Sequence, residues 1–176
     1  ATKDKWPGIA SGLRNALRGI RTHQKNWPAV AAIQAERFVR QPSRQKFTEC
    51  KKVAAKVKVW PKVRESLLQY LENGELPWKQ KGWPLPDSGL DRPGTERKDR
   101  FPMVSNLIDI ALLEKTPERV LYWYDRLPKQ RYGGYGVDDN DIASAIQTHA
   151  PDRAAAIWKS KAERLIALVK PKAYQE

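Results

Sequence analysis

Four Trp-Pro dipeptides constrain how this 176-residue chain can fold: Trp6-Pro7, Trp27-Pro28, Trp60-Pro61 and Trp83-Pro84. Proline is favoured in the first turn of a helix, where its missing N–H has no intrahelical partner. Three of the four dipeptides stand at or just before segments with helical apolar spacing. The step from Trp27 to Trp60 is 33 residues and the step from Pro117 to Pro151 is 34, and each encloses two helices. We therefore expect antiparallel helix pairs.

Helical spacing of apolar residues extends over most of the chain. It predicts helices at about 6–24, 30–41, 43–58, 60–73, 102–113, 117–127, 138–149 and 151–169. The first and last of these are amphipathic, with apolar stripes formed by Ile9, Leu13, Ala16, Leu17 and Ile20, and by Ala155, Trp158, Ala162, Leu165, Ile166 and Val169. Lys170-Pro171 starts a further helix, so we expect the chain to be a fragment of a longer protein.

These helices predict an all-α fold, in which antiparallel pairs stack as a short α-solenoid similar to tetratricopeptide repeats. The alternative is an irregular bundle in which Trp-Pro merely recurs as a way to begin a helix. We divide the chain into basic helical pairs (1–73), an insertion rich in Pro, Gly and Trp (74–102) and C-terminal repeats (103–176), expected as one continuous domain. Within the insertion, 74–90 is expected to be ordered and 91–100 to be a mobile loop.

Charge is distributed unevenly along the chain. There are 33 Lys+Arg and 20 Asp+Glu, which gives a net charge of +13. Residues 1–58 hold 14 cations and 3 anions, and so carry +11 of that excess. The sequence has no apolar run of about 20 residues, and its single cysteine excludes a disulfide framework. We therefore expect a cytoplasmic protein with a polyanionic or acidic partner and no membrane association.

Two sets of cations form the strongest functional signal. Along the first helix they recur at steps of 4, 3 and 4 residues, which places them opposite Ile9, Leu13 and Ile20; along the third they face away from Phe47, Val53 and Val57. Such rows are able to follow a phosphate backbone, without reading bases. The alternative is a solvated helix face. The candidate residues for binding nucleic acid or an acidic partner are Arg14, Arg18, Arg21, Lys25, Arg44, Lys51, Lys52 and Lys56.

Other constellations point away from catalysis. Tyr122, Trp123, Tyr132 and Tyr135 are candidates for an aromatic groove, although core packing is the simpler interpretation. Residues 133–136 read as a turn, because the strand and the Lys-Ser/Thr of a phosphate loop are missing. Cys50 is expected to be a buried, inert thiol. We expect a non-enzyme with no catalytic residue, no metal ligand, no cofactor and no small-molecule substrate.

Several motifs resemble a known family: Tyr70-Leu71-Glu72-Asn73-Gly74-Glu75-Leu76-Pro77-Trp78, Trp83-Pro84-Leu85-Pro86, Phe101-Pro102, Leu107-Ile108-Asp109-Ile110-Ala111, Val120-Leu121-Tyr122-Trp123-Tyr124-Asp125, Ala156-Ile157-Trp158-Lys159 and Ala173-Tyr174. Together they resemble the helical region that follows the zinc motif in prokaryotic SWIM zinc-finger proteins, over about residues 20–176. That motif uses three cysteines and a histidine, and no such cluster occurs here. The resemblance therefore implies a zinc finger elsewhere in the parent protein.

The expected function is a non-catalytic helical-repeat scaffold or protein-interaction module, with a protein as its partner. The alternative is sequence-nonspecific nucleic-acid binding through the basic N-terminal helices.

Overall fold

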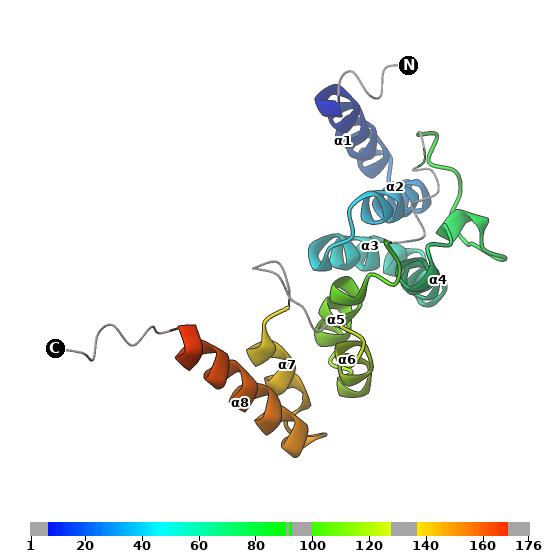
Figure 1. The fold of residues 1–176 in the computed structure, drawn as a ribbon. Coiled ribbons are helices and arrows are strands. Elements are labelled where there is room, and N and C mark those ends of the chain that lie inside the picture. The colour runs from blue at the N-terminus through cyan, green and yellow to red at the C-terminus, as the bar shows by residue number, and fades with distance from the viewer. Residues whose placement is uncertain (1–6, 91, 93–99, 128–136, 169–176) are drawn as a thin grey trace. The chain divides into compact units, whose positions relative to one another are not determined.

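The computed structural model describes residues 7–90, 92, 100–127 and 137–168. The described residues form eight α-helices and one 3₁₀ turn, with no strand among them, so the prediction of an all-α chain is confirmed. The helices are α1 (Pro7–His23), α2 (Trp27–Arg40), α3 (Arg44–Lys56), α4 (Trp60–Asn73), α5 (Val104–Leu113), α6 (Pro117–Tyr124), α7 (Asp139–Ile146) and α8 (Pro151–Leu168), with the 3₁₀ turn η1 at Pro77–Lys79 (Figure 1). The chain divides into two compact units, Ala1–Asn106 and Leu107–Glu176.

The first unit is built around α2, which contacts α1, α3 and α4. Residues 29–36 of α2 are all buried, in agreement with a helix that has neighbours on several sides. Aromatic contacts join the surrounding helices: the Phe38 and Phe47 ring centroids lie 5.7 Å apart, and those of Phe47 and Trp60 lie 5.1 Å apart. The hydroxyl of Tyr70 donates a hydrogen bond to the Val39 carbonyl across 3.1 Å, which ties α4 to α2.

Local capping signals explain where these helices begin and end. The Asn26 side chain accepts a hydrogen bond from the Ala29 N–H at the start of α2, and Ser43 does the same for Lys46 in α3. Gly74 ends α4 in the left-handed region, with φ at 81°. The Thr116 side chain does not cap α6, because its hydroxyl donates to the Ala111 carbonyl instead.

The segment after α4 is irregular but ordered over residues 74–90, as its composition predicted. Leu76, Pro77 and Leu85 are buried, whereas Trp78 and Trp83 are half-buried. Within the expected mobile loop, Arg92 is held by a buried carboxylate of α2. Residues 91 and 93–99 lie outside the described residues.

In the second unit, α7 contacts both α6 and α8. Ile142, Ala143 and Ile146 of α7 are buried, as are Ala154 and Ile157 of α8. The Asp138 carboxylate caps α7 by accepting from the Asn140 N–H at 2.9 Å. The predicted turn at 133–136 lies outside the described residues.

The packed faces of α1 and α8 are not the apolar stripes that the sequence indicated. In α1 the half-buried residues are Arg14, Leu17, Arg18 and Arg21, whereas Leu13, Ala16 and Ile20 are exposed. In α8 the buried residues are Ala154 and Ile157, whereas Trp158, Leu165 and Ile166 are exposed. Half-buried arginines are compatible with the contact between α1 and α2, because the long aliphatic stem of an arginine can pack while its charged end reaches water.

Candidate interaction surface

The basic row of α1 has a position different from the one expected. Arg14, Arg18 and Arg21 are half-buried on the side of the helix that packs, and Lys25 is exposed in the connection to α2 with a positive φ of 56°. The Arg21 guanidinium donates to the Gln24 side-chain carbonyl at 3.1 Å. Within the described part of the chain, none of these four cations forms an ion pair with a carboxylate.

The cations of α3 are exposed, as the helix pattern predicted, but they do not form one cluster. Arg44 and Lys56 occupy opposite ends of the helix, about 18 Å apart along its axis at 1.5 Å per residue. Lys51 and Lys52 are exposed between these ends. The Lys56 ammonium lies 3.6 Å from the ring centroid of Trp27 at the start of α2, a cation–π contact that places the end of α3 beside the start of α2.

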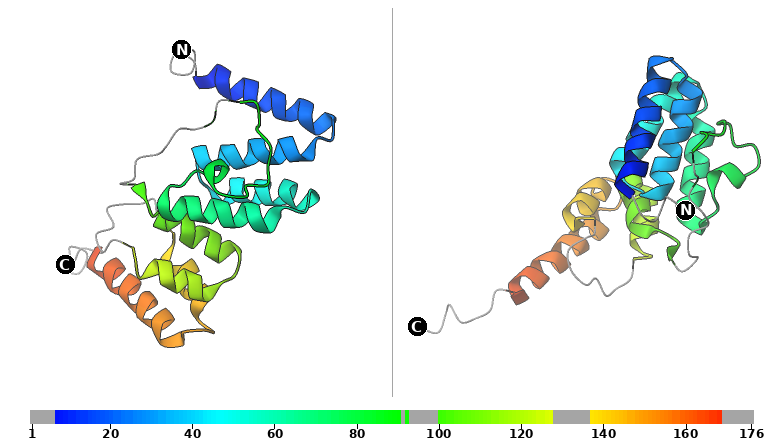
Figure 2. Two further views of the ribbon diagram at one scale, coloured as in Figure 1. Left: turned by 90° about the vertical axis from the view of Figure 1, so that its right-hand side faces the viewer. Right: turned by 90° about the horizontal axis from the view of Figure 1, so that it is seen from above.

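One end of the first unit collects cations from several helices. The α1–α2 and α3–α4 connections lie at the same end (Figure 2, left). We call this surface the basic end, and define it as Arg21, Lys25, Lys56, Lys58 and Lys62. The sequence analysis did not include Lys58 and Lys62 among the candidate residues. The helix starts at Trp27-Pro28 and Trp60-Pro61 were the available signal, because antiparallel pairs place both starts, and the lysines beside Trp60, at one end of the unit.

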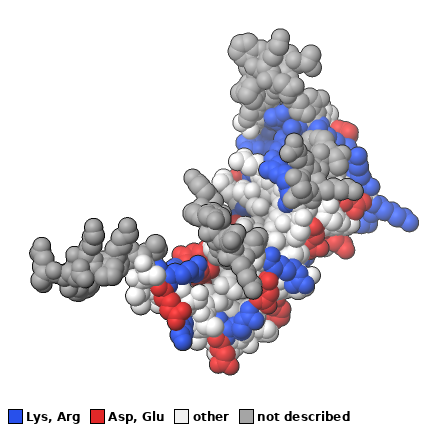
Figure 3. Space-filling model, in the orientation of Figure 1, with Lys and Arg blue, Asp and Glu red and all other residues white. Residues whose placement is uncertain are grey.

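The second unit contrasts with this surface, because several of its cations are paired. Lys161 donates to the Asp138 carboxylate at 2.7 Å, Arg153 pairs with Asp125, and Arg164 pairs with Asp139. The hydrogen bond from Lys161 is the main cause of a lowered pKa of Asp138. In Figure 3 red and blue are interspersed over this unit, whereas blue predominates on the visible surface of the first. In the described part of the chain, by contrast, no ion pair joins a cation of α1 or α3 to a carboxylate.

The proposed aromatic groove does not form around Trp123, since this side chain is only 6% exposed. Its ring stands edge-on to that of Tyr122, with centroids 4.8 Å apart. Tyr122 is half exposed, but the Arg126 guanidinium covers its ring at 3.5 Å. Tyr132 and Tyr135 lie outside the described residues. Trp123 is therefore a core residue, as the alternative interpretation held.

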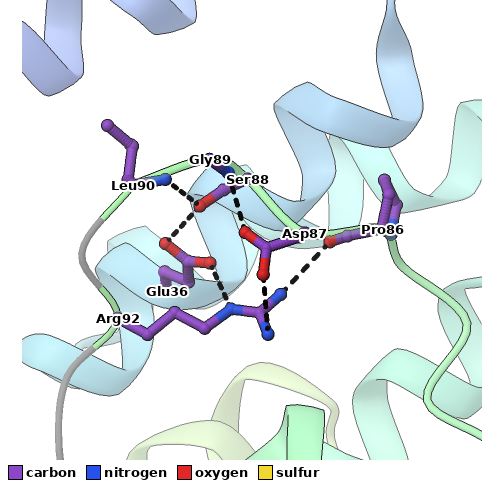
Figure 4. Close-up of polar contacts among 7 residues, drawn as sticks. All are labelled: Glu36, Pro86, Asp87, Ser88, Gly89, Leu90 and Arg92. Atoms are coloured by element: carbon purple, nitrogen blue, oxygen red, sulfur yellow. Dashed lines mark hydrogen bonds and ion pairs between the residues drawn. The ribbon is translucent and has the colours of Figure 1, made fainter.

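A buried carboxylate joins α2 to the irregular segment (Figure 4). Glu36 accepts from the Ser88 hydroxyl at 2.8 Å and from Arg92 Nε at 3.1 Å. Arg92 also lies 3.3 Å from the Asp87 carboxylate, and its guanidinium is 5.3 Å from the Trp78 ring centroid. Burial raises the pKa of Glu36, and the hydrogen bonds from Ser88 and Arg92 partly oppose that rise. These contacts hold Ser88 and Arg92 on α2, and we call them the latch.

The one cysteine, Cys50, is buried. Burial raises the pKa of the Cys50 thiol to about 12, so that the thiolate nucleophile is absent at neutral pH. No group of three or more His, Cys, Asp or Glu among the described residues is placed to hold a metal ion. None of the described helices has the length and apolarity needed to cross a bilayer.

Comparison of the chain with models of known families, with curated proteins and with solved structures finds no match.

Proposed function

We propose that this chain is a non-catalytic helical-repeat scaffold that binds other proteins. The observation that carries this proposal is the outward placement of apolar stripes on two helices. Leu13 and Ile20 of α1 are 64% and 54% exposed, and Leu165 and Ile166 of α8 are 54% and 72% exposed. Contiguous apolar side chains in water are a mark of protein-interaction surfaces. Short connections between α1 and α2, α3 and α4, and α7 and α8 support stacked antiparallel pairs similar to tetratricopeptide repeats.

The resemblance to SWIM zinc-finger proteins fits this role. In a parent protein of that type, the zinc finger supplies one activity and the helical stack supplies a surface for assembly.

Site-specific photo-crosslinking in producing cells tests the scaffold role. p-Benzoylphenylalanine replaces Ile166 on the exposed stripe of α8, and in a matched control it replaces the exposed polar Ser144 of α7. We expect a discrete protein adduct from position 166 that purified components reproduce and that position 144 does not give. Equal adducts at both positions, or adducts to nucleic acid alone, would contradict the scaffold role.

Sequence-nonspecific nucleic-acid binding is the second candidate, favoured by the basic end. A duplex of generic sequence is titrated at increasing salt concentration with the wild type and with Lys25, Lys56, Lys58 and Lys62 all changed to Gln. Each phosphate contact contributes about −0.9 to the log–log salt slope, so the variant is expected to show a flatter slope. Arg44→Gln with Lys51→Gln is the matched control, because Arg44 lies at the other end of α3. No duplex binding by the wild type at about 50 mM salt would refute this candidate.

A further inference from the structure

The two helix connections at the basic end repeat one local structure. Lys25-Asn26-Trp27-Pro28 joins α1 to α2, and Lys58-Val59-Trp60-Pro61 joins α3 to α4. In both connections the lysine is the left-handed residue of a Schellman motif, with φ at 56° and 57°. Its N–H donates to the carbonyl three residues back, and the next N–H donates to the carbonyl five residues back. The basic end therefore presents the same pair of lysine and tryptophan twice.

Lysine is an unusual residue for this position. Glycine occupies it most often, because a positive φ brings the Cβ of other residues into steric conflict with the backbone. Strain of this kind is typical of positions where a side chain has a function. Lys115, at the end of α5, has the same two hydrogen bonds and a φ of 55°, but Thr116-Pro117 follows it without a tryptophan. This third lysine is an internal control for the two that precede an indole.

Both indoles of the basic end lie at the surface of the unit. Trp27 and Trp60 are half-buried, and the ammonium of Lys56 lies 3.6 Å from the ring centroid of Trp27. The Lys56 side chain is itself exposed, so the face of Trp27 beneath it is next to solvent. A cation–π contact at an exposed site is weak. Another flat ring is therefore able to take the place of the ammonium on Trp27.

The charges of the basic end favour phosphate. Lys25, Lys56, Lys58 and Lys62 are exposed, and among the described residues none of them forms an ion pair. A lysine ammonium is a point charge that binds phosphate well, whereas carboxylates are matched better by the planar fork of arginine. An occupant that fits both features carries phosphates and flat rings that stack.

The same features argue against other occupants. The bases of a duplex are stacked inside the helix, so a duplex would contact the lysines and leave the indoles unused. A bilayer requires exposed apolar side chains, and none of the large ones in the described part of the chain lies on α2, α3 or α4. A second copy bound through this end would bring two sets of lysines together, and like charges repel.

We infer that the basic end binds single-stranded nucleic acid. A base stacks on Trp27 in place of the Lys56 ammonium, and the lysines contact the phosphates on either side. Every base has a flat π-face, so such binding does not depend on sequence. This inference rests on nucleic-acid binding, the second candidate function above, and names the form of nucleic acid that the site prefers.

Fluorescence anisotropy tests this preference with the full chain and a labelled oligothymidylate of about 12 nucleotides, beside a duplex of the same length. We expect the strand to bind at least about tenfold more tightly than the duplex, because stacking adds to the phosphate contacts. Lys25→Gly with Lys58→Gly should weaken strand binding at least about fivefold, through the loss of two phosphate contacts. The same variant should keep or raise the urea midpoint, because glycine relieves the positive φ.

Lys115→Gly is the matched control, since it makes the same backbone change where no indole follows. It should also keep or raise the midpoint, and its affinity for the strand should stay within about twofold of the wild type. A variant that is at least as stable as the wild type and binds less tightly has not lost affinity through misfolding.

Photo-crosslinking locates the stacked base without any substitution in the protein. A strand that contains iodouracil is irradiated with the wild type, and mass spectrometry identifies the modified residue. We expect adducts at Trp27 or Trp60. Trp158 of α8 is the control, because it is 38% exposed and an adduct governed by exposure alone would form there.

Equal or tighter binding of the duplex would overturn the inference and leave the nucleic-acid candidate standing. Undiminished strand binding by the Lys25/Lys58 variant, or adducts at Trp158 in place of Trp27 and Trp60, would also overturn it. So would a higher affinity for phosphatidylserine vesicles than for the strand. If neither strand nor duplex binds at about 50 mM salt, the nucleic-acid candidate is lost together with the inference.

Discussion

Arg92→Ala tests whether the latch on Glu36 holds the irregular segment on α2. The substitution removes the hydrogen bond from Arg92 Nε to Glu36 Oε1, at 3.1 Å, and leaves Ser88 as the donor to this carboxylate among the described residues. The Glu36 side chain is 5% exposed and the Arg92 side chain 27% exposed. The carboxylate is thus poorly solvated, and water is a weak substitute for the guanidinium.

The size of the effect follows from this burial. Removing one partner of a fully buried pair costs about 3–5 kcal/mol, because the other charge is left uncompensated. Since solvent reaches Arg92, we expect a smaller loss of unfolding free energy, about 2–3 kcal/mol at pH 8. Arg153→Ala is the control: it breaks the pair with Asp125, in which both side chains are about half exposed. Such surface pairs contribute about 0–1 kcal/mol.

The pH dependence gives a sharper test than the size alone. Burial already raises the folded-state pKa of Glu36 above 4.5, and Arg92 opposes that rise, so the variant should raise this pKa further. A carboxyl whose pKa is higher in the folded than in the unfolded chain binds more protons when folded. The unfolding free energy of the variant should therefore increase, relative to wild type, as pH falls through the folded pKa toward 4.5. The loss of unfolding free energy caused by Arg92→Ala is therefore greatest at pH values above that pKa.

Urea denaturation between pH 4.5 and 8 measures this penalty, with tryptophan fluorescence as a probe because Trp78 lies beside Arg92. Adding Glu36→Gln to Arg92→Ala removes the titrating group, and the pH-dependent part of the penalty should disappear. A penalty for Arg92→Ala that is constant with pH, or as small as that of Arg153→Ala, would refute the reasoning.

Three further outcomes are expected. Gly74→Ala should lower the unfolding free energy by about 2 kcal/mol or more in denaturant titrations, because φ is +81° and the new Cβ would lie 2.6 Å from Phe101 Cε2. Gly19→Ala should instead raise the unfolding free energy by up to about 1 kcal/mol, because Gly19 is helical and a Cβ there meets nothing within 4 Å. Cys50, with its pKa raised to about 12, should react with a thiol reagent at pH 8 only after denaturation, and fast labelling of the native chain would contradict its burial. Tyr70→Phe should cost about 1 kcal/mol, since its hydroxyl donates to a buried carbonyl of α2; no change in the denaturation midpoint would show that this bond contributes nothing.

The helices and their ends could be predicted because their signals are local. Ser43 and Asp138 cap the helices that follow them, and Gly74 ends α4 where the apolar pattern stops. Each of these groups acts within about one turn, so the sequence around it contains what is needed. The latch could not be predicted, because Glu36 and its donors Ser88 and Arg92 are separated by 52 and 56 residues.

The faces of α1 and α8 show where an amphipathic pattern is insufficient. The periodicity of the sequence identifies an apolar stripe on a helix. Which face of the helix packs, however, depends on the neighbouring helix, and the neighbour is set by tertiary contacts. In α1, which contacts α2, Leu17 and the three arginines are half-buried, whereas Leu13 and Ile20 are exposed. Arg14, Arg18 and Arg21, which the pattern placed on the free face, are thus half-buried, whereas Leu13 and Ile20, which it placed in the core, are exposed. A stripe that an amphipathic helix does not use within its own unit is available to a partner.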